Sequence, residues 1–414
     1  MLDIKFIRDN IEKVKIGISS KNYDPSLIDK VLKLDEDKRK LQTEIEGLRS
    51  ERNQIAKSKD VEKGKEVKKK LHEMEPELDK LDSELLEILN LIPNIPSDKA
   101  PVGKSEKENI EIGKWGEPRK FEFNPKDHLK IGTDLGILDF EIGAKVSGSQ
   151  FYFLYGSGAL LELAIVQYAF ERLSKEGFIP VITPDLAKSR FYIGTGYLPK
   201  GSEAQTYTVD GDGLGLIATA EVTLAGKHAD DLIIGEKLPL KYVGYSHCFR
   251  KEAGAYGKYS KGMYRVHQFT KVEMFIYCTP EESDKYHQQI LEMEEKIYQE
   301  LGLPYRVVEM CTGDLGAMAA RKFDLEVWMP GREEYGEVTS TSNCTDYQAR
   351  NLNIKYRKKD GKSEFVHMLN GTAIASSRTI LAILENYQND DGSVTVPEVL
   401  RKWMEKEKIE KTSQ

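Results

Sequence analysis

Two heptad repeats near the N-terminus constrain the fold of this chain more than any other feature. Apolar residues recur at alternating spacings of four and three over residues 27–55, where Lys38 and Arg52 take two of the seam positions, and again over residues 67–92. This spacing predicts helices that pack lengthwise against a partner helix. The segment AKSKDVEKGK between the repeats contains few apolar residues, which indicates a turn. We therefore expect helices at residues 27–57 and 62–92 that form an antiparallel coiled coil.

The predicted turn is rich in lysine. Its candidate contact residues are Lys57, Lys59, Lys63, Lys65, Lys68 and Lys69. One interpretation is a solvated charged surface, and the other is a tip that binds the phosphates of a nucleic acid. Because the whole chain has a net charge of -7 at pH 7, a nucleic-acid contact has to come from a local basic patch of this kind.

Length and composition favour a cytoplasmic protein of two or more domains. The chain has 414 residues, of which 39% are apolar and 31% are charged. No stretch approaches the ~18 consecutive apolar residues of a membrane span, and the N-terminus lacks the apolar core of a signal peptide. The four cysteines are far apart and form no C-x-x-C pair, which argues against a structural zinc site and a disulfide framework.

The pattern changes after a linker near residue 100. The segment LIPNIPSDKAPVGKSEKEN combines three prolines with a run of charges. Beyond it, strand-like segments follow one another, with helices at residues 281–301 and 373–388 but no βαβ rhythm. This order predicts an α+β domain with a mostly antiparallel sheet flanked by helices. We expect domains at residues 1–104 and 105–414, with a mobile loop rich in Gly, Asp and Ser at residues 199–215.

The segment MYRVHQFTKVEMFIY is the first candidate for a binding surface. In a strand, one of its faces carries Arg265, His267, Phe269, Lys271 and Glu273. An aromatic ring flanked by charges suits a pocket for a flat polar ligand, in which Phe269 stacks on a base and Glu273 holds an ammonium or a hydroxyl group. Arg250, at the end of the preceding strand, suits a phosphate. From this segment alone, an ordinary amphipathic hairpin with surface charges is the alternative.

Three other segments carry weaker signals. TAEV places Thr219 and Glu221 on one face if the chain is extended there. GEVTSTSN offers the carboxylate of Glu337 and the hydroxyl of Ser340, which suit Mg²⁺. NGTAIASSRT leads into an apolar helix that carries Arg378.

Together and in this order, these segments resemble class II aminoacyl-tRNA synthetases. FRKE, followed by a loop and a strand, resembles motif 2, and residues 371–378 resemble motif 3. The helix from Gly158, its following strand and Pro184 resemble motif 1. TAEV, FRKEAGA, YRVHQFTKVEMF, EVTSTSN and YQARN, together with the coiled coil, are most similar to the seryl-tRNA synthetase family. The resemblance covers nearly the whole chain and implies a class II antiparallel sheet flanked by helices, with an N-terminal helical arm.

The resemblance also implies an activity and its residues. The chain would activate L-serine with ATP and Mg²⁺, without zinc, and transfer serine to tRNA(Ser), and to tRNA(Sec) as well. Catalytic roles would fall to Arg250 and Arg378. The residues implied for serine are Thr219, Ala220, Glu221, Glu273 and Thr372, and those for ATP are Arg250, Lys251, Glu252, Val266, Phe269, Glu337, Val338, Thr339, Ser340 and Arg378, with Glu337 and Ser340 reaching ATP through Mg²⁺. The lysine-rich tip would contact the long variable arm of the tRNA across a homodimer.

One departure and two alternatives accompany this interpretation. In the motif 2 loop, Lys258, Tyr259 and Lys261 replace the family's usual Arg, Asp and Arg, which changes the contacts available to the acceptor stem. A related ligase that charges a carrier protein would lack the coiled coil. A non-catalytic paralogue that binds tRNA would have lost Arg250, Glu273 or Arg378, which are all present.

Overall fold

The chain packs as two compact units, Met1–Pro96 and Ser97–Gln414. The computed structural model describes all residues except 59, 198–205, 253–261 and 412–414. The boundary between the units lies inside the proline-containing linker.

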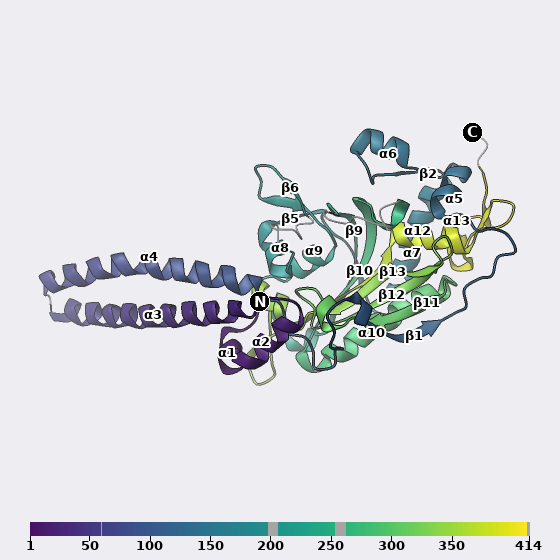
Figure 1. The fold of residues 1–414 in the computed structure, drawn as a ribbon. Coiled ribbons are helices and arrows are strands. Elements are labelled where there is room, and N and C mark those ends of the chain that lie inside the picture. Colours follow the sequence, from purple (N-terminus) through teal and green to yellow (C-terminus); the bar gives the residue numbers. More distant parts are fainter. Residues whose placement is uncertain (59, 198–205, 253–261, 412–414) are drawn as a thin grey trace. The chain divides into compact units, whose positions relative to one another are not determined.

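The first unit consists of helices, and two of them are long (Figure 1). Its elements are α1 (Ile4–Asp9), α2 (Ile11–Ser20), α3 (Ser26–Ser58) and α4 (Val61–Leu91). Ion pairs join Lys38 to Asp82 and Arg49 to Glu75. The residue numbers therefore increase along α3 in the direction in which they decrease along α4. The helices therefore run antiparallel, as the heptads predict.

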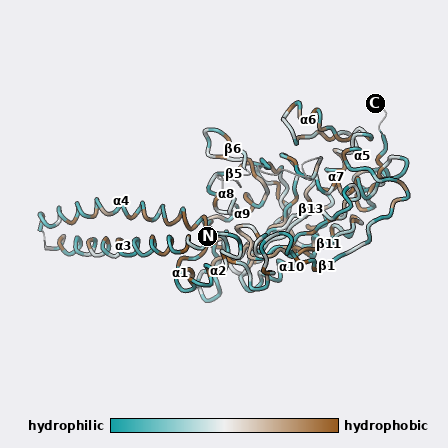
Figure 2. Tube along the Cα trace, viewed as in Figure 1, coloured by the Kyte–Doolittle hydropathy of each residue, from teal (hydrophilic) through white to brown (hydrophobic). Residues whose placement is uncertain are grey.

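The contact between α3 and α4 is narrow. Buried Ile45, Val67 and Leu71 form its centre, and the partly buried seam residues around them are Leu41, Leu48, Ile55, Met74 and Leu78. Hydrophilic residues dominate the rest of both helices (Figure 2). Asp60 caps α4, since its carboxylate accepts a hydrogen bond from the backbone N–H of Lys63 at 3.2 Å. A two-helix arm with a thin apolar seam follows from this pattern.

The second unit is built on one large sheet. Its spatial order is β1 (Ile110–Trp115), β11 (Tyr305–Glu309), β12 (Arg321–Met329), β13 (Glu334–Asn343), β16 (His367–Ala375), β10 (Gln268–Cys278), β9 (Leu240–Phe249) and β4 (Ile179–Ile182). Only the pairing of β4 with β9 is parallel among these described strands. The predicted α+β fold with a mostly antiparallel sheet is confirmed.

Helices cover the two faces of this sheet differently (Figure 1). On one face, alternate residues of β10, from Val272 to Cys278, enter the main core with α7 (Ser157–Lys175), α10 (Ser283–Glu300) and α12 (Ser376–Asn386). On the other face, Phe275 and Tyr277 pack with α9 (Glu221–Gly226) and α11 (Tyr347–Leu352). This second face of β10 also carries Phe269, Lys271 and Glu273, so the predicted alternation is confirmed for these three residues. Arg265 and His267 precede the strand, and their predicted place on its face is wrong.

Shorter elements complete the unit. The remaining helices are α5 (His128–Leu135), α6 (Phe140–Ser147), α8 (Ser189–Thr195) and α13 (Arg401–Met404). The remaining strands are β2 (Leu138–Asp139), β3 (Phe153–Leu154), β5 (Leu186–Lys188), β6 (Tyr207–Val209), β7 (Leu214–Leu216), β8 (Leu232–Ile234), β14 (Lys355–Arg357), β15 (Ser363–Phe365), β17 (Val394–Thr395) and β18 (Lys408–Ile409).

The predicted loop at residues 199–215 is partly wrong. Residues 199–205 lie outside the described part of the chain, but β6 and β7 form an antiparallel hairpin that also pairs with β5. The turn between them is Asp-Gly-Asp-Gly, in which Gly211 and Gly213 have φ angles of +88° and +62°. The glycines and aspartates that suggested a loop therefore supply the left-handed turn of a hairpin.

Candidate active site

One polar cavity of about 260 Å³ opens on the face of β10 that carries Phe269, Lys271 and Glu273. The sequence-predicted residues that line it are Glu221, Arg250, Glu252, Val266, Phe269, Glu273, Glu337, Val338, Thr339, Ser340, Thr372 and Arg378. These residues come from segments more than 150 positions apart in the sequence, as Glu221 and Arg378 show. They meet because β9, β10, β16 and β13 are neighbours in the sheet.

Glu221 stands at one end of the cavity, in a shell of neutral hydrogen-bond donors. Its Oε1 accepts from Gln348 Nε2 at 2.7 Å and from Asn370 Nδ2 at 3.1 Å, and its Oε2 accepts from the Tyr197 hydroxyl at 3.0 Å. Burial, and then the nearby charge of Glu273, raise the pKa of Glu221 to about 7. The shell fixes the carboxyl group but brings it no positive charge.

Glu273 lies nearby and has a cationic partner. Its carboxylate pairs with Lys271 Nζ at 2.6 Å and accepts a hydrogen bond from the Thr372 hydroxyl at 3.0 Å. All three side chains are buried. A bulge on β16, where Ala373 is the extra residue opposite Val272 and Glu273 of β10, brings Thr372 into register with the acid. One of the two neighbouring glutamates is thus already neutralised, and the other is not.

Arg250 and Phe269 form the next part of the cavity wall. The guanidinium of Arg250 lies 5.3 Å from the centre of the Phe269 ring, and its Nε donates to the Ala218 carbonyl at 3.4 Å. Val266 packs beside Phe269 in a small apolar cluster. Glu252, at the lip of the cavity, pairs with Arg265 at 3.2 Å. An apolar slot with an arginine above it is suited to a planar, anionic ligand.

Arg378 closes the opposite wall. Its Nη1 donates to the Glu337 carbonyl at 3.0 Å and pairs with the Glu337 carboxylate at 3.1 Å, and its Nε donates to the Tyr264 carbonyl at 3.2 Å. Its guanidinium also lies 4.6 Å from the centre of the Tyr264 ring. Burial opposes ionisation of Glu337, but Arg378 and Lys322 overcome it and lower the pKa of Glu337 to about 2. Both partners are therefore charged at neutral pH.

A bulge explains how Glu337 and Ser340, three positions apart in β13, face the same side. The register with β12 shifts here, so that Thr339 opposes Leu325 while Glu337 opposes Glu326. Val338 is the extra residue, and without it the strand alternation would put Glu337 and Ser340 on opposite faces. The carboxylate and the hydroxyl then share the cavity side of β13.

This pair of oxygen ligands fits Mg²⁺ bound together with phosphates. In proteins Mg²⁺ keeps several waters and takes only one or two carboxylates besides the phosphates of its substrate. In the described part of the chain, no group of three or more His, Cys, Asp or Glu side chains is arranged to hold a metal by itself. The donors at Glu337 and Ser340 suit a shared magnesium rather than a closed metal site.

Three predicted site residues do not line the cavity. Thr219 and Ala220 are buried just before α9, and the Thr219 hydroxyl accepts a hydrogen bond from the Glu221 backbone N–H at 3.2 Å. TAEV is therefore the start of a helix rather than an extended segment, because this side-chain bond satisfies a free N–H of the first turn. Lys251 is exposed and lies 5.7 Å from the centre of the Tyr207 ring.

Several lining residues escaped the sequence analysis. They are Tyr197, Tyr264, Lys322, Ser342, Asn370, Ala375, Ser377 and the segment Leu315–Ala319. Arg265 and Lys271, which the strand pattern placed on the candidate face with Phe269 and Glu273, also line the cavity, although neither was given a role. Leu315–Ala319 has no charge or aromatic pattern, and nothing in its sequence marks it.

Comparison with known proteins decides the family. The model of the seryl-tRNA synthetase N-terminal domain matches residues 1–96, and the model of the tRNA synthetase class II core domain (G, H, P, S and T) matches residues 207–387. The serine–tRNA ligases of Dictyoglomus turgidum and Treponema denticola are each 51% identical to this chain, over 98% and 97% of it and 98% of each relative. The chain belongs to the seryl-tRNA synthetase family.

Solved structures agree with this result. Seryl-tRNA synthetase from Pyrococcus horikoshii complexed with ATP matches with a TM-score of 0.93 and 42% identity, over 100% of both chains. Cytoplasmic serine–tRNA ligase from Naegleria fowleri in complex with AMP matches with a TM-score of 0.88 and 36% identity, over 100% of this chain and 99% of that one. The predicted family and fold class are confirmed.

The lysine-rich end of the arm is a second candidate site. Lys57, Lys63, Lys65, Lys68 and Lys69 are exposed, while Lys59 lies outside the described residues. Three of them pair with neighbouring acids at 3.1–3.8 Å, namely Lys63, Lys65 and Lys69. Exposed pairs of this kind are weak, so these lysines can exchange an acid for a phosphate at little cost.

Two further predictions concern the motif 2 loop and the absence of a membrane span. Lys258, Tyr259 and Lys261 lie outside the described residues. Among the helices that the structure describes, none combines the length and the apolar character needed to cross a bilayer.

Proposed function

We propose that this chain is a cytoplasmic, ATP-dependent serine–tRNA ligase. The observation that carries the proposal is the single cavity that joins two arginines and an aromatic ring at one end to two buried glutamates at the other. A nucleotide and a small amino acid bound in it would lie side by side, which is what the formation of an aminoacyl-adenylate requires.

The two glutamates divide the recognition of serine. Glu221 has three neutral donors and no cation, so the serine ammonium supplies the charge that it lacks. Glu273 is already neutralised by Lys271 and accepts a hydrogen bond from the Thr372 hydroxyl, so the remaining acceptor positions of this pair receive the serine hydroxyl. Alanine has no hydroxyl to make this bond, and such sites reject the smaller analogue by roughly 10⁴. Thr219 and Ala220 support Glu221 by starting α9.

The first chemical step needs little proton transfer. An oxygen of the serine carboxylate attacks the α-phosphorus of ATP in line, and the bond from that phosphorus to the bridging oxygen of pyrophosphate breaks. Arg250 contacts the α-phosphate, Phe269 and Val266 hold the adenine, and Arg378 meets the terminal phosphates. Glu337 and Ser340 would hold Mg²⁺, which would supply neutralisation of the phosphate charge. Positioning and charge stabilisation therefore account for the rate.

Arg250 has to move for this arrangement to form. Its guanidinium lies above Phe269, where the adenine would stack. A phosphate is a stronger partner for guanidinium than an aromatic ring or the Ala218 carbonyl, so ATP draws Arg250 away and uncovers the ring.

The second step passes serine from the adenylate to the terminal ribose of tRNA(Ser). The arm then has a function, because its exposed lysines contact the tRNA backbone away from the anticodon. We include tRNA(Sec) as a substrate on the same ground. The carrier-protein alternative has no use for the arm formed by α3 and α4.

We also propose a homodimer through α7 and β4. Leu160 and Leu163 on α7, and Ile179 and Ile182 on β4, are exposed, with Ile182 79% accessible. β4 ends the described sheet, and an edge strand with apolar side chains is prone to pair with a partner. Ile182→Asp should convert the dimer to a monomer in analytical ultracentrifugation, whereas Val102→Asp, at an exposed apolar residue outside α7 and β4, should not. A wild-type monomer would contradict this part of the proposal.

Pyrophosphate exchange tests the activity. With ATP, Mg²⁺ and a panel of single amino acids, we expect exchange with serine in the absence of tRNA, and at least a thousandfold less with alanine, glycine or threonine. Charging of tRNA(Ser) against a serine carrier protein then separates the ligase from its alternative. Equal exchange with alanine and serine would refute the specificity.

A further inference from the structure

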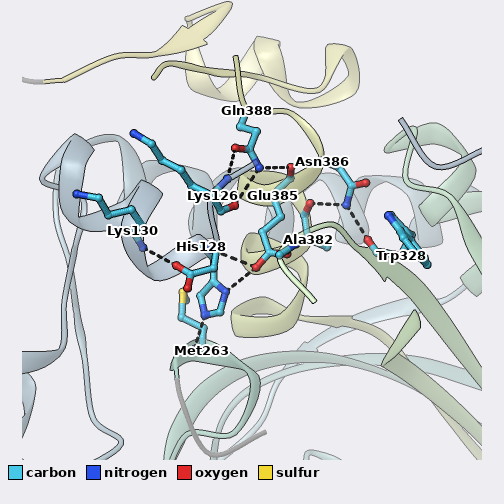
Figure 3. A network of polar contacts seen from close by, with 11 residues as sticks. Lys126, His128, Lys130, Met263, Trp328, Ala382, Glu385, Asn386 and Gln388 are labelled. Carbon is cyan, nitrogen blue, oxygen red and sulfur yellow. Dashed lines mark hydrogen bonds and ion pairs between the residues drawn. The ribbon is translucent and has the colours of Figure 1, made fainter. Parts of the chain in front are cut away.

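A buried polar network, drawn in Figure 3, lies outside the residues that line the cavity. At its centre, His128 Nδ1 lies 2.8 Å from Glu385 Oε1, and both side chains are almost completely buried. Neither residue lines the cavity, and the sequence analysis assigned no role to either. They begin α5 and end α12, two elements that are far apart in the sequence.

The hydrogen bonds fix the tautomer of His128. The backbone N–H of Met263 donates to Nε2 at 3.1 Å, so Nε2 must be the unprotonated nitrogen. Nδ1 then carries the hydrogen and donates to Glu385. The imidazole therefore receives one hydrogen bond and passes one on, which ties its orientation to both neighbours.

Glu385 extends the network to a second loop. Besides the imidazole, its Oε1 accepts from the His128 backbone N–H at 3.1 Å, and its Oε2 accepts from the Gly331 N–H at 2.8 Å. Gly331 lies in the turn between β12 and β13. One carboxylate thus connects α5, α12 and the β12–β13 turn.

Each anchored backbone position is next to a residue that positions Arg378. Met263 precedes Tyr264, whose carbonyl accepts from Arg378 Nε and whose ring lies beneath the Arg378 guanidinium. Gly331 precedes Arg332, whose guanidinium lies 4.4 Å from the centre of the same ring. Tyr264 is thus in contact with two arginines, and the His128–Glu385 pair holds the backbone beside both the ring and Arg332.

The chain is built to allow this close approach. A β-carbon at Gly262 would lie 2.1 Å from His128 Nε2, and Gly262 has a φ angle of +78°. A residue with a side chain there would push Met263 away from the imidazole.

We propose that His128 and Glu385 are positioning residues for the nucleotide. They fix the position of the Tyr264 ring and carbonyl next to the guanidinium of Arg378, and thereby the direction in which Arg378 points into the cavity. The proposal rests on the proposed function, because it assigns the nucleotide to that end of the cavity. It predicts a defect that is specific to ATP and spares serine, whose partners Glu221 and Glu273 lie outside the network.

Two substitutions, each of which places an amide atom near one of the two ring nitrogens, separate the two hydrogen bonds of the imidazole. In His128→Asn, the amide nitrogen reaches the position of Nδ1 and keeps the bond to Glu385, but nothing accepts from Met263. In His128→Gln, the longer side chain places its oxygen near the position of Nε2 and keeps the bond from Met263. The loss of one hydrogen bond changes an equilibrium constant by about five- to tenfold. We therefore expect the Asn variant to raise the KM and Kd for ATP by about that factor, and the Gln variant to have values close to those of the wild type.

The measurements are the KM values for ATP and serine in pyrophosphate exchange, the Kd for ATP from calorimetry, and the melting temperature. The control is His228→Asn. The imidazole of His228 lies outside the cavity and is hydrogen-bonded at both nitrogens, to Asp231 at 2.9 Å and to the Tyr242 hydroxyl at 3.0 Å, so the substitution also removes one of two hydrogen bonds. It should lower the melting temperature and leave both KM values unchanged.

The outcomes are distinct. A weaker affinity for ATP in the Asn variant alone, with the KM for serine unchanged, supports the proposal. Equal ATP affinities for the Asn and Gln variants, or an equal loss for ATP and serine, overturn it and leave a purely structural role. If the Asn variant does not fold, Glu385→Gln, which turns a donor towards the Gly331 N–H, must weaken ATP binding in its place. Wild-type protein without serine-dependent exchange would instead refute the proposed function itself.

Discussion

The two ends of the cavity handle charge in opposite ways. At the nucleotide end, Arg378 and Glu337 satisfy each other, and their pKa values are shifted towards the charged forms. At the serine end, Lys271 satisfies Glu273, while Glu221 has only neutral partners and a pKa of about 7. The nucleotide end is preorganised around groups that stay ionised. At the serine end, Glu221 has no cationic hydrogen-bond partner and is available to a cationic ligand. Four predictions test this difference, in order of decreasing effect.

Removal of Arg378 should have the largest effect. Arg378→Ala removes a charge that meets the phosphates and leaves Glu337 with Lys322 as its main cation. We expect kcat/KM for pyrophosphate exchange to fall by about 10³, the usual cost of one preorganised charge. Arg357→Ala, at an exposed position of β14, serves as control and should be neutral. A loss below tenfold would mean that Arg378 has a structural role only.

Removal of Lys271 tests the neutralised acid. Lys271→Met leaves the carboxylate of Glu273 buried without a cation, so the free energy of unfolding in urea should fall by about 3–5 kcal/mol. The exposed pair of Lys285 and Glu282, at 3.2 Å, provides the matched control. Lys285→Met should cost less than about 1 kcal/mol. If both substitutions lowered the free energy of unfolding by the same amount, Lys271 would not be needed to neutralise a buried Glu273, and Glu273 would not differ from Glu221 in this respect.

Glu221→Gln tests the acid that has no cation. Glutamine can keep the bonds from Gln348 and Asn370 to its oxygen, so stability should not fall. The serine ammonium loses its charged partner, and the KM for serine should rise by about 10- to 100-fold while the KM for ATP stays constant. An unchanged KM for serine would place the ammonium elsewhere.

The pH dependence of serine binding should be the smallest effect. Burial, then Glu273, raise the pKa of Glu221 to about 7, so below that pH the acid is neutral and attracts the ammonium weakly. The KM for serine should therefore fall roughly tenfold as the pH rises from 6 to 8. Glu221→Gln should flatten this profile, and an equal slope in the variant would assign the titration to another group.

The parts that were predictable from the sequence are those set by local periodicity. The heptads of α3 and α4 and the alternation of β10 place side chains without reference to the rest of the molecule. The bulge at Val338 and the helix start at Thr219 depend on hydrogen bonds with other segments, so sequence spacing misjudged the backbone of TAEV and gave no reason for Glu337 and Ser340 to share a face.

Long-range polar contacts were the hardest to predict. Tyr264 was passed over as a strand residue, although it ends a short 3₁₀ helix against Arg378. His128 and Glu385 meet 257 positions apart in the sequence, and neither stands in a pattern that marks it. Leu315–Ala319 reaches the cavity only because the loop before β12 passes over it.

ATP and serine should occupy one cavity, and a sulfamoyl analogue of seryl-adenylate provides the sharpest test of this shared site. Calorimetry should show one analogue bound per chain, and inhibition of pyrophosphate exchange should be competitive with both ATP and serine. An analogue that competes with ATP but leaves the binding of serine unaffected would place the two substrates in separate sites and contradict the account.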